Sequence, residues 1–255
     1  AYIYPKGRLD RVEQLAEGSI PSDFFYGSHE LKQKGHEVDL FEFDGEYCRN
    51  RFVRFIGQKL YALCLLPARA RGELLENVRA RLPELRKYDV IVAIQSSTAL
   101  ALAIWSALGL IKVPIVAIHC GFQERAHTRF QKRITSFLLR RIWSQVFGEG
   151  EIGELKRLFA VPEERLMVNQ YGVDLSFWTP GKVNDSDRYV FALGNDVLRD
   201  YETLVRAALK IDCKVLIVTR KNIEEKLPPN VELVQGSWHG KDIDDSRLRE
   251  MYRQS

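Results

Sequence analysis

The stretch DVIVAIQSSTALALAIWSALGLIKVPIVAIHCG, residues 89–121, decides the fold. It opens with a short apolar run, Val90 to Ile94, rich in β-branched residues and typical of a strand buried on both faces. Ala99 to Leu108 is helical in composition, and Gly109 is placed to end that helix. A second apolar run covers Ile115 to Ile118. The stretch therefore predicts a strand, a crossover helix and a second strand parallel to the first.

Polar residues follow both predicted strands. Ser96 and Ser97 come after the first strand, and His119 comes after the second. Because parallel strands end at the same edge of a sheet, where open α/β sheets bind ligands, we expect all three residues near a ligand. The serine hydroxyls also predict N-terminal caps for the helix. Two interpretations of His119 stay open at this point: a ligand contact, and a structural histidine satisfied at a strand end.

Length and composition are those of a soluble globular protein. A chain of 255 residues suits one large or two modest domains. The hydrophobic content of 45% and the charged content of 28% are ordinary. No apolar run approaches the roughly 20 residues that span a bilayer, and no secretory signal opens the sequence. The four cysteines show neither metal-site spacing nor a pairing pattern, which favours free, mostly buried thiols and a cytoplasmic location.

The alternation of strands and helices continues on both sides of this stretch. Strands are predicted at residues 2–4, 38–43, 145–148 and 166–170, and helices at 22–34, 48–67, 73–87, 125–141 and 151–159. The polar segment 183–188 predicts a linker, and a second α/β pattern begins at Tyr189. We therefore predict a Rossmann-like domain over residues 1–182 and the first part of a second one over residues 183–255.

Four stretches, in their order and spacing, resemble the retaining glycosyltransferases of family 4. They are LKQKGHEVDLFEF at 31–43, VPIVAIHCG at 113–121, NQYGVDLSFWTP at 169–180 and FALGNDVLRDYETLVRAALKIDCKVLIVTRKN at 191–222. The resemblance implies the GT-B architecture, an α/β fold in which two Rossmann-like domains with parallel sheets face each other. It further implies that the first domain binds the acceptor and the second, incomplete in this sequence, binds the nucleotide-sugar donor.

The resemblance also implies roles for individual residues. His119 is expected to be catalytic, orienting the acceptor or stabilising developing charge. Transfer is expected to retain anomeric configuration and to need no metal ion and no cofactor, the nucleotide-sugar being a substrate. The remaining predicted site residues are Gly7, Ser96, Ser97 and Glu149 on the acceptor side, and Gly194, Asn195, Arg199, Arg220 and Lys221 on the donor side.

The sequence departs from the family pattern in two places. The family's donor domain usually begins with Gly-Arg, whereas this sequence has Gly194 and Asn195. Arg199 is the nearest substitute cation, and its five-donor fork suits a phosphate, although a solvated arginine before a helix capped by Asp200 is an open alternative. The sequence also ends at Ser255, before the family's paired glutamates. We therefore expect it to be part of a longer protein.

Two predicted helical segments carry six cations each and no acid, around apolar stripes. They span residues 49–71 and 125–143. Such surfaces favour an anionic partner, and we predict a peripheral location on the inner face of the membrane. The residues predicted to lie on the membrane surface are Arg129, Lys132, Arg133 and Arg140. The alternative is that both stripes pack on the sheet and the cations are solvated.

The sequence thus predicts a glycosyltransferase that moves a sugar from a nucleotide-sugar to a sugar or lipid-linked acceptor. Nucleic acid is not an expected partner, because no RNA-reading motif accompanies the basic segments. Two alternatives stay open. One is another GT-B activity, such as a sugar-nucleotide epimerase, and the other is a catalytically silent peripheral membrane or partner-binding module, which Asn195 favours.

Overall fold

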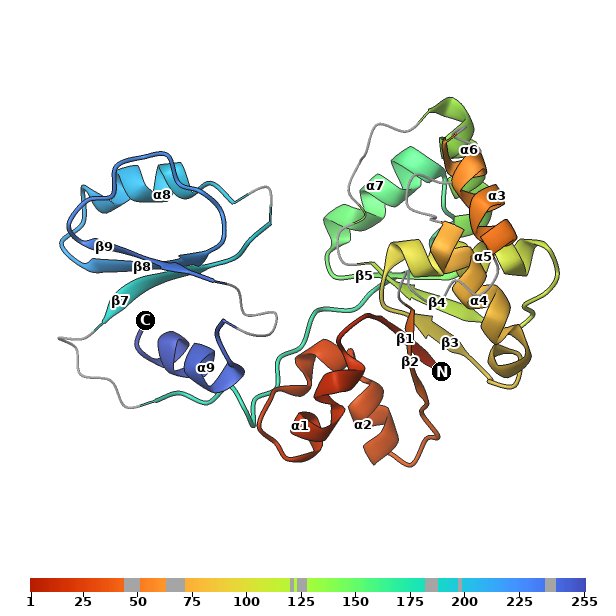
Figure 1. Cartoon of the computed structure of the whole chain (residues 1–255), viewed down its shortest axis with the longest axis horizontal. Helices are drawn as coiled ribbons and strands as arrows, with labels where there is room; N and C mark the ends of the chain where they lie inside the picture. The colour runs from red at the N-terminus through yellow and green to blue at the C-terminus, as the bar shows by residue number, and fades with distance from the viewer. Residues whose placement is uncertain are drawn as a thin grey trace. The chain divides into compact units, whose positions relative to one another are not determined.

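The computed structural model describes residues 1–43, 51–62, 72–119, 122, 128–181, 188–196, 199–236 and 242–255. The chain divides into two compact units, the first comprising Ala1–Val12 and Asp23–Gly172 and the second Glu13–Ser22 and Val173–Ser255. Each unit is built on a parallel sheet (Figure 1). The predicted α/β fold class with two Rossmann-like units is therefore confirmed. The predicted domain boundary at residues 182 and 183 falls outside the described residues.

The first unit holds a six-stranded parallel sheet with the order β2-β1-β3-β4-β5-β6. The strands are β1 (Tyr2–Pro5), β2 (Leu40–Phe43), β3 (Ile91–Ala93), β4 (Ile115–Ile118), β5 (Trp143–Val146) and β6 (Leu166–Val168). The two strands and the crossover helix predicted from residue 89 onward are present as expected, with Ile91 paired to Ile115 and Ala93 to Ala117. Both strands are almost fully buried, which explains their continuous apolar sequences.

Five helices of the first unit pack beside one another in chain order against the core of this sheet. They are α3 (Arg51–Ala62), α4 (Gly72–Leu85), α5 (Ser96–Ala107), α6 (Arg129–Leu139) and α7 (Glu149–Phe159). Gly109 ends α5 as predicted: its φ is +74°, its N–H bonds to the Ser106 carbonyl, and the N–H of Leu110 reaches the Trp105 carbonyl. This is the Schellman arrangement, which a glycine adopts without strain.

The single helix predicted at residues 22–34 is wrong. The segment forms a 3-10 helix η2 (Ser22–Phe25) and a separate short helix α2 (Ser28–Gln33). Between them Tyr26 and Gly27 both have positive φ, at 50° and 84°. Two consecutive left-handed residues cannot continue a right-handed helix, so the chain turns there. A short segment absent from the prediction, η1 (Leu9–Arg11) and α1 (Val12–Ala16), precedes them.

The second unit has a three-stranded parallel sheet with the order β7-β8-β9. Its elements are β7 (Tyr189–Leu193), α8 (Tyr201–Ala208), β8 (Lys214–Thr219), β9 (Val231–Gln235) and α9 (Asp245–Arg253). Alternate residues of β8 face two separate cores. Val215 and Ile217 pack with α8, while Leu216 and Val218 pack with α9. The sheet therefore has one helix on each face (Figure 1).

One further expectation concerned the cysteines. Cys213 is a free thiol, as expected, and it is exposed, whereas the sequence favours thiols that are mostly buried. It lies in the short turn between α8 and β8, where the chain runs over the surface. Cys48, Cys64 and Cys120 lie outside the described residues.

Candidate functional site

The predicted acceptor-side residues lie at one edge of the six-stranded sheet. Since every strand runs in the same direction, all carboxyl ends meet there. Gly7 follows β1, Ser96 and Ser97 follow β3, His119 follows β4, and Glu149 follows β5. The topology thus brings together residues that are far apart in the sequence.

The His119 side chain is fully buried and is hydrogen bonded through both ring nitrogens. Nδ1 lies 2.8 Å from Ser96 Oγ, and Nε2 lies 3.1 Å from Ser144 Oγ. The ring of Phe122 stands edge-on to the imidazole at 5.1 Å between centroids. This is the arrangement of a satisfied histidine at a strand end. For His119 to contact an acceptor, one hydroxyl partner would have to be exchanged, and its catalytic role stays a prediction.

The prediction that Ser96 and Ser97 cap helix α5 is wrong. The cap position is Gln95, whose side chain makes no capping hydrogen bond. Ser96 is already the first residue of the helix, and its Oγ serves His119. The reason is energetic: a buried imidazole needs a protein partner, whereas water can satisfy exposed N–H groups at a helix start. The Oγ of Ser97 lies 3.5 Å from Gln95 Oε1.

Gly7 and Glu149 are at the edge but in different environments. Gly7 has a φ of +88° and makes the turn after β1. The N–H groups of Arg8 and Leu9, which follow it, both donate to Glu42 Oε1 at the end of β2. Glu149 is exposed at the first position of α7, where the helix dipole favours a carboxylate.

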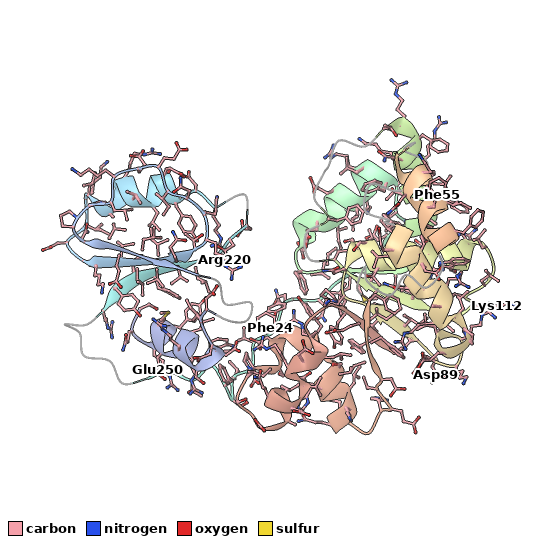
Figure 2. The ribbon with its side chains drawn as sticks, viewed as in Figure 1. Phe24, Phe55, Asp89, Lys112, Arg220 and Glu250 are labelled. Carbon is pink, nitrogen blue, oxygen red and sulfur yellow. The ribbon has the colours of Figure 1, made fainter. Side chains whose placement is uncertain are left out.

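A group of aromatic rings at this edge was missed by the sequence reasoning. Tyr26 and Tyr171 lie 5.8 Å apart between ring centroids, and Phe147 and Tyr171 lie 5.3 Å apart. The guanidinium of Arg8 lies 5.0 Å from the centre of the Phe24 ring, which Figure 2 labels. A signal was available, because Phe147 and Tyr171 each come within three residues of a strand end.

The predicted donor-side residues meet at the carboxyl edge of β7 and β8. Asn195 Oδ1 accepts from the N–H of Arg220 and lies 3.1 Å from Thr219 Oγ. Since a backbone N–H can only donate, the atom facing Arg220 must be the amide oxygen. Asn195 is exposed, and its Nδ2 group carries two N–H donors. Asn195 thus lacks the cation of the family pattern but carries neutral donors.

Arg199 packs directly over Gly194. A Cβ added to Gly194, whose φ is +154°, would lie 2.7 Å from Arg199 Nε, so a larger residue there would displace the Arg199 side chain. Nε of Arg199 donates to Asp196 Oδ2 at 2.7 Å, and this bond raises the pKa of the guanidinium. Lys221 Nζ donates to the carbonyl of Arg199 at 2.6 Å. Three of the predicted donor-side residues therefore form one connected group.

Local acids balance the cations of this group. Arg220, labelled in Figure 2, pairs with Asp242, and Asp200 caps α8 by accepting from the N–H of Thr203 at 3.0 Å. The predicted cap is confirmed, and it has a consequence. Because a carboxylate already occupies the N-terminus of α8, an incoming diphosphate has to rely on side chains more than on the helix dipole.

Three of the four predicted membrane-surface residues, Arg129, Lys132 and Arg133, lie on α6, and the fourth, Arg140, directly follows it. An open groove of about 430 Å³, the basic groove, lies between α6 and α7. Its lining contains four cations, which are Lys132, Arg133, Arg140 and Arg157. Phe130 and Phe137, on the same helix, are each 51% exposed. The predicted apolar stripe is therefore divided, since Leu138 and Ile142 are buried in the core.

The second basic segment is described in part. On α3, Phe52, Phe55 and Ile56 are exposed, and Figure 2 labels Phe55. The prediction of a continuous basic helix ending at Pro67 extends beyond the described residues, as do Arg49, Arg69 and Arg71. Within the described part of the chain, no helix is long and apolar enough to cross a membrane. In that same part, no group of three or more His, Cys, Asp or Glu side chains is placed to hold a metal ion.

The whole chain is similar in fold to a known glycosyltransferase structure. The crystal structure of a glycosyltransferase from Rickettsia africae ESF-5 matches 100% of this chain and 70% of its own length, with a TM-score of 0.59 and 12% identity. At that identity the similarity establishes the fold, which is of the GT-B type predicted. No family model and no curated protein matches the sequence.

Two further structures are more distantly similar. Anabaena Alr3699/HepE in complex with UDP is 14% identical, with a TM-score of 0.45 over 74% of this chain and 49% of its own. A GtfA/B complex bound to UDP and GlcNAc is 13% identical, with a TM-score of 0.34 over 71% and 39%. The chain thus spans half or less of these two proteins, and TM-scores below 0.5 establish no common fold.

Proposed function

We propose that the chain belongs to a glycosyltransferase that moves a sugar from a nucleotide-sugar to an acceptor. The observation that carries the proposal is the group at the end of β7 and β8, where Gly194, Asn195, Arg199 and Lys221 converge. Open α/β sheets bind ligands at this edge, and two cations with an amide suit a diphosphate. The similarity in fold to a glycosyltransferase supports the same reading.

In the proposed reaction, the leaving nucleoside diphosphate gains negative charge as the glycosidic bond to the donor breaks. Arg199 would exchange Asp196 for a phosphoryl oxygen, and Asn195 Nδ2 would donate a neutral hydrogen bond beside it. Stabilising charge that develops in the transition state is the largest contribution that such groups make. Retention of configuration and independence from metal ions remain proposals, supported by the family resemblance of the sequence.

We also propose that the acceptor is lipid-linked or membrane-associated and that the protein docks on the inner face of a membrane. The support is the surface of α6, which combines cations lining a groove with exposed Phe130 and Phe137. Anionic lipids attract clustered cations, and aromatic side chains insert at the headgroup boundary. A cytoplasmic location and a peripheral attachment follow from this proposal.

The donor site is tested by measuring UDP and GDP binding to the full-length protein by calorimetry. Arg199→Ala should weaken the binding of the preferred nucleotide by about 1.5–3 kcal/mol, the value of a charge-assisted hydrogen bond. Asp196→Asn should strengthen it, since the diphosphate then meets one carboxylate fewer and no longer competes for Arg199. The matched control is Arg206→Ala, which removes an exposed arginine of α8 that pairs with Glu225. It should leave the affinity for the nucleotide unchanged.

Two results would count against this site. Unchanged affinity in Arg199→Ala would move the phosphate contact elsewhere, with Lys221 and Arg220 the next residues to replace. Absence of nucleotide binding by the unaltered protein would favour the catalytically silent alternative.

A further inference from the structure

The aromatic rings at the carboxyl edge of the six-stranded sheet form a partly exposed cluster. Tyr26, Phe147 and Tyr171 come from three separate segments and contact one another, with centroid distances of 5.3 to 6.4 Å. Tyr171 is 41% exposed, and the other two are partly buried. Tyr171 packs edge-to-face against both other rings and is itself partly exposed, so this cluster offers an apolar platform where α/β sheets bind ligands.

The backbone conformation at Tyr26 is an independent indication of a ligand site. Its φ of 50° is left-handed, a conformation that bulky residues rarely adopt, and the following Gly27 is left-handed as well. Such conformations persist where the surrounding structure imposes them, and they cluster at ligand sites. Here Tyr26 and Gly27 turn the backbone between η2 and α2 and place the Tyr26 ring against Tyr171.

Arg8 supplies a cation beside the platform. Burial lowers the pKa of its guanidinium, and the neighbouring hydroxyls of Tyr26 and Tyr171 oppose that shift. Among the described residues, no carboxylate forms an ion pair with the Arg8 side chain. The carboxylate of Glu42, on β2, is bound instead to the backbone N–H groups of Arg8 and Leu9. A partly buried guanidinium that has aromatic neighbours, and no carboxylate partner in the described part of the chain, is suited to an anionic ligand.

We propose that Tyr26, Phe147, Tyr171 and Arg8 form a subsite for a sugar ring that carries a negative charge, either a phosphate or a carboxylate. The apolar face of the pyranose would lie on the rings, and its anionic group would pair with the guanidinium fork. This inference rests on the proposed function in one respect, because it identifies the bound sugar with the acceptor. It narrows the acceptor to an anionic saccharide.

The experiment measures binding of four probes by calorimetry: glucose 6-phosphate, glucuronate, glucose and inorganic phosphate. The unaltered protein should bind at least one anionic sugar about tenfold or more tightly than glucose and than phosphate alone. Which of the two it prefers identifies the anionic group. Arg8→Gln should reduce that affinity to the level of glucose. Tyr171→Ala should weaken every sugar, whereas Tyr171→Phe, which keeps the ring, should not.

The control is Lys112→Gln, an exposed cation before β4 at the opposite edge of the same sheet, labelled in Figure 2. It should leave all affinities unchanged. If Arg8→Gln lowers the melting temperature, Arg8→Lys keeps the charge without the bidentate fork and should still lose part of the preference. Tyr171 is exposed enough for its variants to fold, so the ring requirement is tested in either case.

Equal affinity for glucose and the anionic sugars, or an unchanged preference in both Arg8 variants, would overturn the inference. So would the absence of sugar binding by the unaltered protein. UDP binding, measured in the same samples, separates this result from the proposed function. Loss of anionic-sugar binding with normal UDP binding concerns the subsite alone, whereas anionic-sugar binding without any nucleotide binding would keep the subsite and remove the transferase.

Discussion

At the scale of single residues, His119 illustrates how position and chemistry can point in different directions. The sequence placed it at the ligand edge of the sheet, and it lies there. Its two ring nitrogens are nevertheless both engaged by buried hydroxyls, those of Ser96 and Ser144. A side chain held in this way contributes to stability whatever else it does.

We therefore expect His119→Ala to lower the free energy of unfolding by about 2–4 kcal/mol, through a cavity and two hydroxyls left without their partner. Urea denaturation measures this, with Ser97→Ala as a control expected to change stability by less than about 0.5 kcal/mol. An alanine variant as stable as the unaltered protein would contradict the structural role. Activity separates the two roles: if His119 only supports the edge, Ser144→Ala should reduce turnover by a comparable factor.

Asn195 and Ser96 show why residue types alone do not predict contacts. From the sequence, Asn195 is a missing cation and Ser96 is a helix cap. In the structure, both side chains bind groups on neighbouring segments of the sheet, Arg220 and His119 respectively. These partners are 25 and 23 residues away in the sequence, and only the register of the parallel strands brings them together.

At the scale of elements, hydrophobic pattern and turn chemistry predicted regular segments well and backbone exceptions poorly. The bounds of β4 agree with the prediction, because a short apolar run between turn residues leaves little choice. The break at Tyr26 was not predictable, since a tyrosine gives no sequence signal of a positive φ. The Tyr26 ring reaches the aromatic cluster through that break, so its part in the cluster was not predictable, whereas Phe147 and Tyr171 carried a signal in their positions after strand ends.

Asp174, in the segment that follows β6, joins two parts of the second unit. Its Oδ2 accepts from the N–H of Ser22 at 3.0 Å, and its Oδ1 accepts from the N–H groups of Ser176 and Phe177 at 3.0 and 3.2 Å. Burial by itself would raise the pKa of this carboxyl, but the hydrogen bonds from Ser176, Ser22 and Phe177 together lower it below 3.8. The ionised form is therefore the one that stabilises the fold.

A folded-state pKa below the unfolded value means that this stabilisation is complete above about pH 4 and is lost as the pH falls through the lowered pKa. Asp174→Asn should cost about 1 kcal/mol at pH 7, as loss of a capping carboxylate does. The difference between the variant and the unaltered protein should shrink in acid below that range. Urea denaturation at pH 7 and in acid measures both values. A difference that stays constant with pH would show that Asp174 does not act through its charge.

At the scale of the whole molecule, the uneven distribution of charge was visible in the sequence, but its location on the surface was not. The periodicity of residues 125–143 could not show which apolar side chains face the core. The structure divides the stripe, burying Leu138 and Ile142 and leaving Phe130 and Phe137 exposed. Exposed aromatic side chains beside a basic groove argue for the membrane interpretation, because cations alone would be equally consistent with a solvated face.

The membrane proposal predicts binding to vesicles that contain anionic lipid, not to neutral ones, and weaker binding at higher salt, since exposed charges are screened over about 8 Å at physiological ionic strength. Replacing Arg129, Lys132, Arg133 and Arg140 with Gln removes four cations and brings the formal net charge from +4 to zero. At about 1 kcal/mol per cation near the surface, vesicle binding should fall at least tenfold. Phe130→Ser with Phe137→Ser should weaken binding without changing charge.

The control replaces four exposed lysines elsewhere, Lys32, Lys34, Lys87 and Lys112, with Gln and reaches the same net charge. Cosedimentation with liposomes at two salt concentrations distinguishes the α6 variant from the control. Equal loss of vesicle binding in both charge variants would mean that only net charge matters. If the unaltered protein does not pellet with the liposomes, a soluble acceptor takes the place of a lipid-linked one.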